Sequence, residues 1–376
     1  MRRVLIVMSQ TGGGHRSAAL ALARAFDYLY DNHVRVEIVD IFRNGRRTVW
    51  EKLTDLYGPI TVHSPALWAV IWHVFRQKAG FEAVVRAASP ALLPKVRGLL
   101  AEARPDLVVS VHPLANPLLV RARPQVNPRL PMAVVYTDLV VVHPGWRYPG
   151  FQLYTAASKP AWEEFVRHGL PPDRVILTGL PVDIRFALNR PSPARARENL
   201  GLDPELFTLL VVGGAEGVGK IGRVVRVARQ ACPDAQILVV CGRNRALYRR
   251  LAAQADPLMR VYGFVENIWE LMAAADVILT KAGPMTIGEG LAAGKPLIFI
   301  SYIPGHEEGN AAYVVEAGAG RMGLKPRDLR TELERLRADP AYRAEMTGRA
   351  AELGRPAAAL EVVRMLGSGF LGLGPE

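Results

Sequence analysis

The chain has 376 residues, of which 50% are hydrophobic, and it carries a formal net charge of +12. This length exceeds what one hydrophobic core usually serves, so two domains are expected. Its two cysteines are too few for a disulfide framework or a cysteine-based zinc site, and no apolar run is long enough to span a bilayer. Glycines and a histidine follow the first short apolar run where a cleavage site would lie, which favours a buried first strand and a cytoplasmic protein.

The positive charge is concentrated in the first half of the chain. Residues 1–178 hold 22 Lys and Arg against 13 Asp and Glu, a balance of +9. A basic half attracts polyanions, either nucleic acid or anionic lipid, although an arginine-rich composition that serves solubility is the alternative. No nucleic-acid module is found, because aromatic residues are not interleaved with basic strands. We therefore expect an anionic membrane surface and no nucleic acid.

Short apolar runs alternate with helical periodicity along the whole chain. Strands are predicted at 4–8, 34–38, 107–111 and 133–136, with helices at 18–30 and 94–103; further strands are predicted at 207–212, 236–241, 260–263, 277–280 and 296–300. This alternation is typical of parallel sheets with helices on both faces, and its restart predicts two such sheets. The Pro-rich, polar stretch 189–205 is interpreted as the linker between them.

A glycine-rich turn with a histidine follows the first predicted strand. Gly12, Gly13 and Gly14 allow a close approach of the backbone, and His15 falls in the first turn of the next helix, where the dipole favours neutral imidazole. Ligands of open α/β sheets bind beyond the carboxyl ends of the strands. We therefore expect His15 to face a ligand.

Three more candidate functional residues follow the strand predicted at 133–136. Asp138 could act as a general base or orient one, and Trp146, near His143, could stack on a sugar or on a lipid glycerol backbone. The alternative for Asp138 is a helix cap, and Trp146 could equally be structural.

The stretch 63–78 is predicted to be an apolar, aromatic helix flanked by cations. Trp68, Trp72 and Phe75 share helical spacing, which is typical of an element at a membrane interface. Packing within its own domain is the alternative.

In the second half, Gly214 to Lys220 has the glycine and lysine spacing of a nucleotide triphosphate loop. Ile221 stands where a Ser or Thr should hold magnesium, so a P-loop enzyme is excluded. The first βα unit carries no clean GxGxxG either, which argues against a dinucleotide oxidoreductase. What remains is a turn that offers backbone N–H groups to a phosphate, or an ordinary tight turn.

Two loops at later strand ends complete the predicted site. Residues 281–286 precede a helix with Pro284 in its first turn, where a diphosphate could bind, and Glu289 could accept two ribose hydroxyls or neutralise the helix dipole. The next loop packs together the donors and acceptors that a polyhydroxylated ligand needs, unless it is simply solvated: His306, Glu307, Glu308 and Asn310.

These motifs together resemble a known family. The segments are TGGGH (11–15), TDLVVVHPGW (137–146), GGAEGVGK (213–220), CGRN (241–244), TKAGPMTIGEGL (280–291) and PGHEEGNAAYVVEAGAG (304–320). They look like the monogalactosyldiacylglycerol synthase and processive diacylglycerol glucosyltransferase family, which is related to the peptidoglycan lipid II N-acetylglucosaminyltransferase. The resemblance covers most of the chain, from residue 4 to about residue 320.

The resemblance implies an α/β protein of the GT-B fold, with two Rossmann-like doubly wound domains facing across a cleft. Residues 1–180, joined by a crossing helix at 355–368, would bind the acceptor and the membrane, and residues 181–354 would bind the UDP-sugar. The implied enzyme is an inverting glycosyltransferase that moves a hexose to diacylglycerol or a glycosyl-diacylglycerol. It would use no metal and no tightly bound cofactor, and it would lie at the inner face of the cell membrane.

The same resemblance assigns roles to residues. His15 is the candidate general base, and Asp138 is its competitor or its orienting partner. Residues 264–265 would hold the uracil through their backbone, and Glu289 would bind the ribose. The remaining acceptor residues are Trp72, His143 and Trp146; the donor residues are Gly14, Gly214, Glu216, Gly217, Gly242, Arg243, Asn244, Phe264, Val265, Lys281, Ala282, Gly283, Pro284, Thr286, Glu289, His306, Glu307, Glu308 and Asn310.

His306 stands where the family commonly has glutamine, which leaves the choice of sugar open. A lipid II-type N-acetylglucosaminyltransferase and a UDP-sugar 2-epimerase of similar architecture remain the alternative enzymes. A non-catalytic binder of nucleic acid or of a sugar nucleotide is the alternative of another class.

Overall fold

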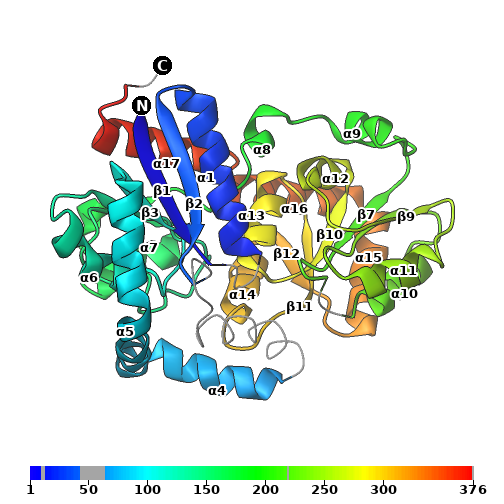
Figure 1. Ribbon diagram of the computed structural model, residues 1–376. Helices are drawn as coiled ribbons and strands as arrows, with labels where there is room; N and C mark the ends of the chain where they lie inside the picture. The colour runs from blue at the N-terminus through cyan, green and yellow to red at the C-terminus, as the bar shows by residue number, and fades with distance from the viewer. Residues whose placement is uncertain (10–12, 43–63, 218–219, 375–376) are drawn as a thin grey trace. The chain divides into compact units, whose positions relative to one another are not determined.

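The structure is a computed structural model that describes residues 1–9, 13–42, 64–217 and 220–374. The chain forms two compact units, one of Met1–Ile184 with Ala357–Glu376 and one of Arg185–Pro356. Each unit is built on a six-stranded parallel sheet flanked by helices (Figure 1). The predicted fold class, with two Rossmann-like sheets, is confirmed.

The sheet of the first unit has the strand order β2-β1-β3-β4-β5-β6, and all its pairs are parallel. Its strands are β1 (Arg2–Met8), β2 (Val34–Asp40), β3 (Leu107–Ser110), β4 (Met132–Val134), β5 (Leu153–Ala156) and β6 (Val175–Leu177). β3 is apolar except for its last residue and buried throughout, as expected of a parallel strand covered on both faces. Strand order reverses between β1 and β3, which is where such sheets bind ligands.

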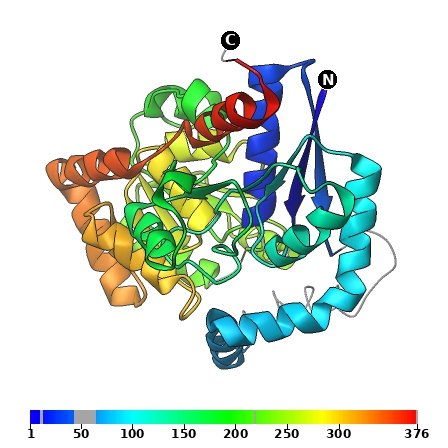
Figure 2. The ribbon, with the colours of Figure 1, turned by 90° about the vertical axis from the view of Figure 1, so that its left-hand side faces the viewer.

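Helices cover the sheet of the first unit. They are α1 (Gly14–Tyr30), α4 (Pro65–Arg76), α5 (Lys78–Ala103), α6 (Asn116–Val126), α7 (Lys159–Arg167) and α17 (Ala358–Leu366). The C-terminal helix α17 packs on α1, as Figure 2 shows. Four alanines of α1, at 18, 19, 21 and 25, are buried and allow a neighbouring backbone to approach closely.

The sheet of the second unit has the strand order β12-β11-β10-β7-β8-β9, again all parallel. Its strands are β7 (Thr208–Val212), β8 (Gln236–Val240), β9 (Met259–Tyr262), β10 (Val277–Lys281), β11 (Leu297–Ser301) and β12 (Gly320–Met322). This is the strand order of dinucleotide-binding sheets, and it reverses between β7 and β10.

The helices of the second unit are α8 (Arg185–Leu188), α9 (Pro193–Asn199), α10 (Ile221–Ala231), α11 (Arg245–Ala252), α12 (Ile268–Ala274), α13 (Pro284–Ala292), α14 (Glu308–Glu316), α15 (Pro326–Ala338) and α16 (Pro340–Leu353). Right-handed crossovers place α10 and α11 on one face of the sheet and α12 and α13 on the other. The helix α15 packs beside α10.

The stretch 189–205, interpreted from its composition as a linker, is a packed part of the second unit. It contains α9, whose Arg197 is buried and donates hydrogen bonds to the carbonyls of Ala274 (2.9 Å) and Pro204 (2.8 Å). Arg197 also pairs with Asp276 at 2.7 Å. Beside this pair, Lys295 donates to Ala273 O at 2.9 Å, and burial lowers the pKa of Lys295 to about 8. The buried Arg197 therefore ties this stretch to the residues around the start of β10.

Candidate active site

Two histidines meet at the switch point of the first sheet. His15 is the second residue of α1, directly after Gly14, and His112 lies two residues beyond the end of β3. Their ring centroids are 4.6 Å apart with an interplanar angle of 72°. The reversal of strand order thus brings together two residues that lie almost a hundred positions apart in the sequence.

A threonine that sequence reasoning did not select contacts the predicted base. Thr137, in the loop after β4, places Oγ1 2.8 Å from Nδ1 of His15. The same hydroxyl lies 3.5 Å from Val111 O, to which it can donate its single proton. In that arrangement Oγ1 accepts from Nδ1–H, and the basic lone pair of the imidazole resides on Nε2. The name histidine cluster is used below for His15, His112, Thr137 and Trp146.

The histidine cluster is largely enclosed. Burial, followed by the nearby His15 and His143, holds the pKa of His112 well below its usual range, so His112 is neutral at pH 7. Trp146 is 3% exposed, and its ring centroid lies 6.0 Å from that of His15 and 5.4 Å from that of Tyr136. Trp146 therefore forms a wall of the cluster and does not present an open stacking surface.

The other predicted residues of the first unit lie around this cluster. Asp138 is buried, and its Oδ1 accepts a hydrogen bond from the N–H of Leu139 at 2.8 Å. His143 is also buried and accepts from Gly145 N at 3.0 Å through Nδ1. Trp72 of α4 lies 5.6 Å from the ring of His143. The structure thus places Thr137, the neighbour of Asp138 in sequence, on Nδ1 of His15.

At the switch point of the second sheet, a lysine approaches two glycine turns. Lys281 ends β10, and its Cε lies 3.5 Å from the position that a Cβ would take at Gly214 and 3.4 Å from that at Gly283. Gly283 is the N-cap of α13, so the cation lies beside a helix N-terminus. Lys281 Nζ pairs with Glu307 Oε1 at 2.5 Å. Lys281, Gly214, Gly283 and Glu307 form the lysine cluster.

Glu307 is 3% exposed, and both of its oxygens have partners inside the unit. While Oε1 binds Lys281, Oε2 accepts from the backbone N–H of Ile303 at 3.0 Å. A buried carboxylate needs such pairing, since an isolated one would be strongly destabilising. Glu307, predicted to face the sugar, therefore holds the ammonium group of Lys281 in place.

The loops after β7 and β8 touch each other through glycines. A Cβ at Gly217 would lie 2.1 Å from Cys241 O, and one at Gly242 would lie 2.3 Å from Ala215 O; both residues have positive φ. Two more contacts join the loops, an ion pair of Arg243 with Glu216 at 2.6 Å and a hydrogen bond from Asn244 to Gly217 O at 3.3 Å. Only glycine fits both positions, because a side chain would collide with backbone oxygen.

The remaining predicted donor residues also lie at or near the carboxyl edge of this sheet. Phe264, after β9, is 51% exposed, and the guanidinium of Arg243 lies 5.0 Å from its ring centroid. Val265 follows Phe264 in the same loop. Ala282 follows β10; Pro284, Thr286 and Glu289 belong to α13, whose first turn contains no acidic residue. Glu289 therefore lies beyond the turn in which a carboxylate neutralises the dipole.

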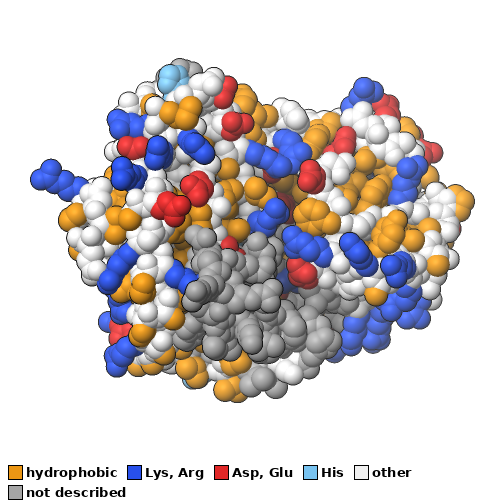
Figure 3. Space-filling model, in the orientation of Figure 1, with side chains coloured by type: hydrophobic (Ala, Val, Ile, Leu, Met, Phe, Trp, Pro, Cys, Tyr) orange, Lys and Arg blue, Asp and Glu red, His pale blue; other side chains and the backbone are white. Residues whose placement is uncertain are grey.

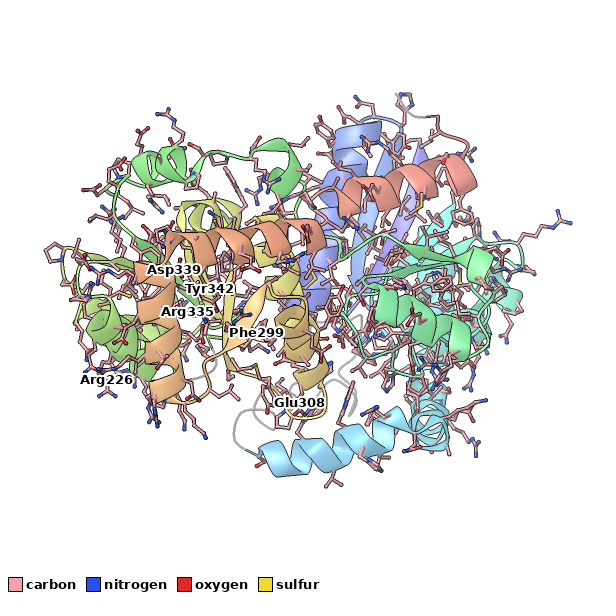
Figure 4. All side chains as sticks on the ribbon, turned by 180° about the vertical axis from the view of Figure 1, so that it is seen from behind. Arg226, Phe299, Glu308, Arg335, Asp339 and Tyr342 are labelled. Carbon is pink, nitrogen blue, oxygen red and sulfur yellow. The ribbon has the colours of Figure 1, made fainter. Side chains whose placement is uncertain are left out.

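His306, Glu307, Glu308 and Asn310 surround the start of α14. Glu307 is its N-cap, and Glu308 is its first residue and is exposed (Figure 4). Asn310 is fully buried, and its N–H donates to Glu307 O at 3.1 Å. The polar loop thus divides into a buried, structural part and an exposed part that a ligand can reach.

Across the described ranges, no group of three or more His, Cys, Asp and Glu side chains has the arrangement of a metal site. Among the helices that the structure describes, none combines the length and the apolar character needed to cross a membrane.

Solved structures with the same fold come from enzymes of nucleotide sugars and related transferases. The crystal structure of MurG from Acinetobacter baumannii has a TM-score of 0.64 and 17% identity, covering 98% of this chain and 100% of that one. The UDP-GlcNAc 2-epimerase of Neisseria meningitidis, bound to UDP-GlcNAc, has a TM-score of 0.61 and 14% identity over 97% and 99%. These likenesses define the GT-B fold class and leave the reaction open.

Sequence relatives resolve the reaction class. The family model described as monogalactosyldiacylglycerol (MGDG) synthase matches residues 15–182, and the glycosyltransferase family 28 C-terminal domain matches residues 208–362. A monogalactosyldiacylglycerol synthase of Spinacia oleracea is 32% identical over 97% of this chain and 72% of its own length. A probable one of Nicotiana tabacum is 33% identical over 87% of this chain, which spans 63% of that relative. The chain belongs to the monogalactosyldiacylglycerol synthase family of glycosyltransferases.

Proposed function

We propose that this protein transfers galactose from UDP-galactose to the free hydroxyl of diacylglycerol, with inversion at the anomeric carbon. The names of its relatives, monogalactosyldiacylglycerol synthases, support this donor and this acceptor. They favour neither the lipid II transferase nor the epimerase that share the fold. The chain's own histidine and lysine clusters supply the chemistry that such a transfer needs.

The contact of Thr137 with His15 carries the proposal on the acceptor side. With Nδ1 protonated and held by Thr137 at 2.8 Å, Nε2 is the atom that takes the proton of the acceptor hydroxyl. The acceptor oxygen then bonds to the anomeric carbon as the bond from that carbon to the β-phosphate oxygen breaks. UDP leaves with the electron pair. Asp138 remains the alternative base.

On the donor side, the lysine cluster would stabilise the charge that develops on UDP. The ammonium of Lys281 and the N–H groups at the start of α13 lie at the reversal of strand order, where phosphates bind in such sheets. Charge-assisted hydrogen bonds there strengthen as the leaving group becomes more negative, which is the condition for lowering the barrier. Glu289 on the same helix is proposed to bind the ribose, and the exposed side of the loop at 306–310 the galactose.

We propose peripheral association with the inner face of the cell membrane, which would bring the protein to a lipid acceptor. The helix α4 supports it, because Val70 and Val74 are 63% and 46% exposed. Its tryptophans point elsewhere: Trp68 and Trp72 stack at 5.9 Å, and Trp72 also lies against His143. The proposed membrane contact of α4 is therefore aliphatic, whereas the sequence left open an aromatic membrane contact or packing within its own domain.

A product assay tests the function. The purified protein is incubated with radiolabelled UDP-galactose, UDP-glucose or UDP-N-acetylglucosamine and with diacylglycerol in mixed micelles, and the lipids are identified by mass spectrometry. We expect a β-galactosyl-diacylglycerol to dominate. Conversion of a UDP-sugar in the absence of acceptor would identify an epimerase, and transfer only from UDP-N-acetylglucosamine to a polyprenyl-linked acceptor would identify a peptidoglycan enzyme.

A further inference from the structure

The second unit carries a strongly basic surface that the proposed transfer does not use. Six exposed cations lie on α10, on α11 and at the residue before α10, and they are called the arginine face: Lys220, Arg223, Arg226, Arg245, Arg249 and Arg250. Figure 3 shows Lys and Arg side chains crowded over the region where Figure 1 places these two helices. Figure 4 shows Arg226 at the outer edge of the unit.

The cations of this face lie on two adjacent helices that contain no acidic residue. The guanidinium of Arg250 on α11 reaches α10, where Nη2 lies 3.3 Å from the position that a Cβ would take at Gly222. From residue 220 to residue 250 the chain has one acidic residue, Asp234, which is paired with Arg337 of α15. Within the part of the chain that the structure describes, no side chain of the arginine face forms an ion pair. Six positive charges are therefore gathered without compensation.

The neighbouring helix α15 shows what an ordinary charged surface of this unit looks like. It alternates both signs, with Asp328, Glu332 and Glu334 among its arginines. Its Arg330 donates to Gln230 of α10 at 2.6 Å. Since α10 and α11 pack on the same sheet as α15 but carry no acid, the arginine face is a local property of these two helices.

We propose that the arginine face docks the second unit onto an anionic lipid surface. Each lysine or arginine close to such a surface strengthens binding, and cations on adjacent helices act on the surface together. Tyr248 lies on α11 between Arg245 and Arg249 and is 40% exposed. A tyrosine among arginines suits the headgroup region, where its ring is apolar and its hydroxyl is hydrated.

A lipid surface fits better than a nucleic acid, given that the proposed acceptor is a membrane lipid. The inference rests on the proposed function in its choice of a lipid surface. It adds a second membrane contact to the one proposed for α4. It assigns membrane binding to the unit proposed to hold the sugar nucleotide as well as to the unit proposed to hold the acceptor.

Vesicle flotation with the full chain tests the proposal. The vesicles contain phosphatidylcholine with 0 or 30% phosphatidylserine. The triple variant R223Q/R226Q/R249Q is compared with R195Q/R327Q/R349Q, which removes the same charge from other exposed sites of the unit. We expect the first triple variant to bind anionic vesicles about 100-fold more weakly than the unaltered protein at low ionic strength, and the control triple variant to lose less than about fivefold.

Two further measurements separate this proposal from the proposed function. Transfer to diacylglycerol in neutral detergent micelles is expected to stay within twofold in both triple variants, because no membrane charge is present there. The single variant R226E provides the same vesicle test should the triple variant not fold. Equal vesicle binding by the two triple variants, or tighter binding of the unaltered protein to duplex DNA than to anionic vesicles, would overturn the assignment.

Discussion

Thr137 and His15, 122 positions apart in the chain, meet through an Oγ1 to Nδ1 contact of 2.8 Å. This contact joins the loop after β4 to the first turn of α1. When the Thr137 hydroxyl donates to Val111 O, the imidazole carries its proton on Nδ1. The proposed base is therefore held by a neutral hydroxyl, in a loop whose next residue is the buried Asp138.

The Thr137→Val substitution keeps the volume and removes the hydroxyl. We expect kcat to fall about 10- to 100-fold with little change in the KM for UDP-galactose, because the base loses its orientation while the donor site is untouched. The Thr137→Ser variant keeps the hydroxyl and should retain most of the activity. An unchanged pH–rate profile and an unchanged kcat in Thr137→Val would show that Thr137 is only a packing residue.

Removal of the proposed base has a larger effect. His15→Ala should lower kcat by about 100- to 10,000-fold, the range that general-base catalysis supplies, while the affinity for UDP measured by calorimetry stays the same. Asp138→Asn serves as the comparison, and we expect the smaller loss there. Near-normal turnover of His15→Ala together with an inactive Asp138→Asn would transfer the role of base to Asp138.

Lys281 is expected to contribute to donor binding. Lys281→Met would remove the proposed charge-assisted hydrogen bond to the diphosphate, so the affinity for UDP should fall about 10- to 100-fold in a titration calorimeter. The substitution also leaves the buried carboxylate of Glu307 without its cation. The double variant Lys281→Met/Glu307→Gln removes that unpaired negative charge. Lys325→Met, an exposed lysine of the same unit, is the control. If Lys281→Met and Lys325→Met bind UDP equally well, the lysine cluster does not hold the diphosphate.

The pairing of the β7 and β8 loops predicts a strict requirement for glycine. Gly242→Ala places a Cβ 2.3 Å from Ala215 O at a φ of +57°, so the loops must separate, and we expect a loss of about 2 kcal/mol or more in unfolding free energy. Gly348→Ala is the matched control, since a Cβ in that helix meets nothing within 4 Å. It should stabilise the protein by up to about 1 kcal/mol in urea unfolding.

Lys295 gives the folded protein a pH dependence of known sign. Burial lowers the pKa of Lys295 from 10.5 to about 8, so the folded state releases a proton that the unfolded state keeps between these two values. Unfolding free energy therefore rises with pH across that window, by about 3 kcal/mol at most, and the cost of the buried charge is fully present below pH 8. Between pH 7.5 and pH 9.5, the melting temperature of the unaltered protein should therefore rise relative to that of Lys295→Met. A pH-independent difference would show that the pKa of Lys295 is the same in the folded and the unfolded state.

The sequence predicted that the candidate residues follow the strands at the carboxyl edges of two sheets, because glycines and polar residues directly after apolar runs are a local signal. It did not locate Thr137 as the partner of His15, since that contact depends on strand order, which no local pattern encodes. The strands β5, β6 and β12 were not predicted, because each contributes an apolar run of at most three residues. The equally short β4 was predicted, because it lies within the longer apolar run 130–136. For α4 the helix was predicted, whereas the inward direction of Trp68 and Trp72 depends on what lies beside it.

The helix α17 belongs to the first unit although the whole second unit, Arg185–Pro356, separates it in sequence from the rest of that unit. Its apolar side covers α1, the helix that carries the proposed base. During synthesis, the surface of α1 that α17 covers therefore stays exposed until α17 has left the ribosome. The unit that is made first therefore completes its packing last, after all of the second unit has been synthesised.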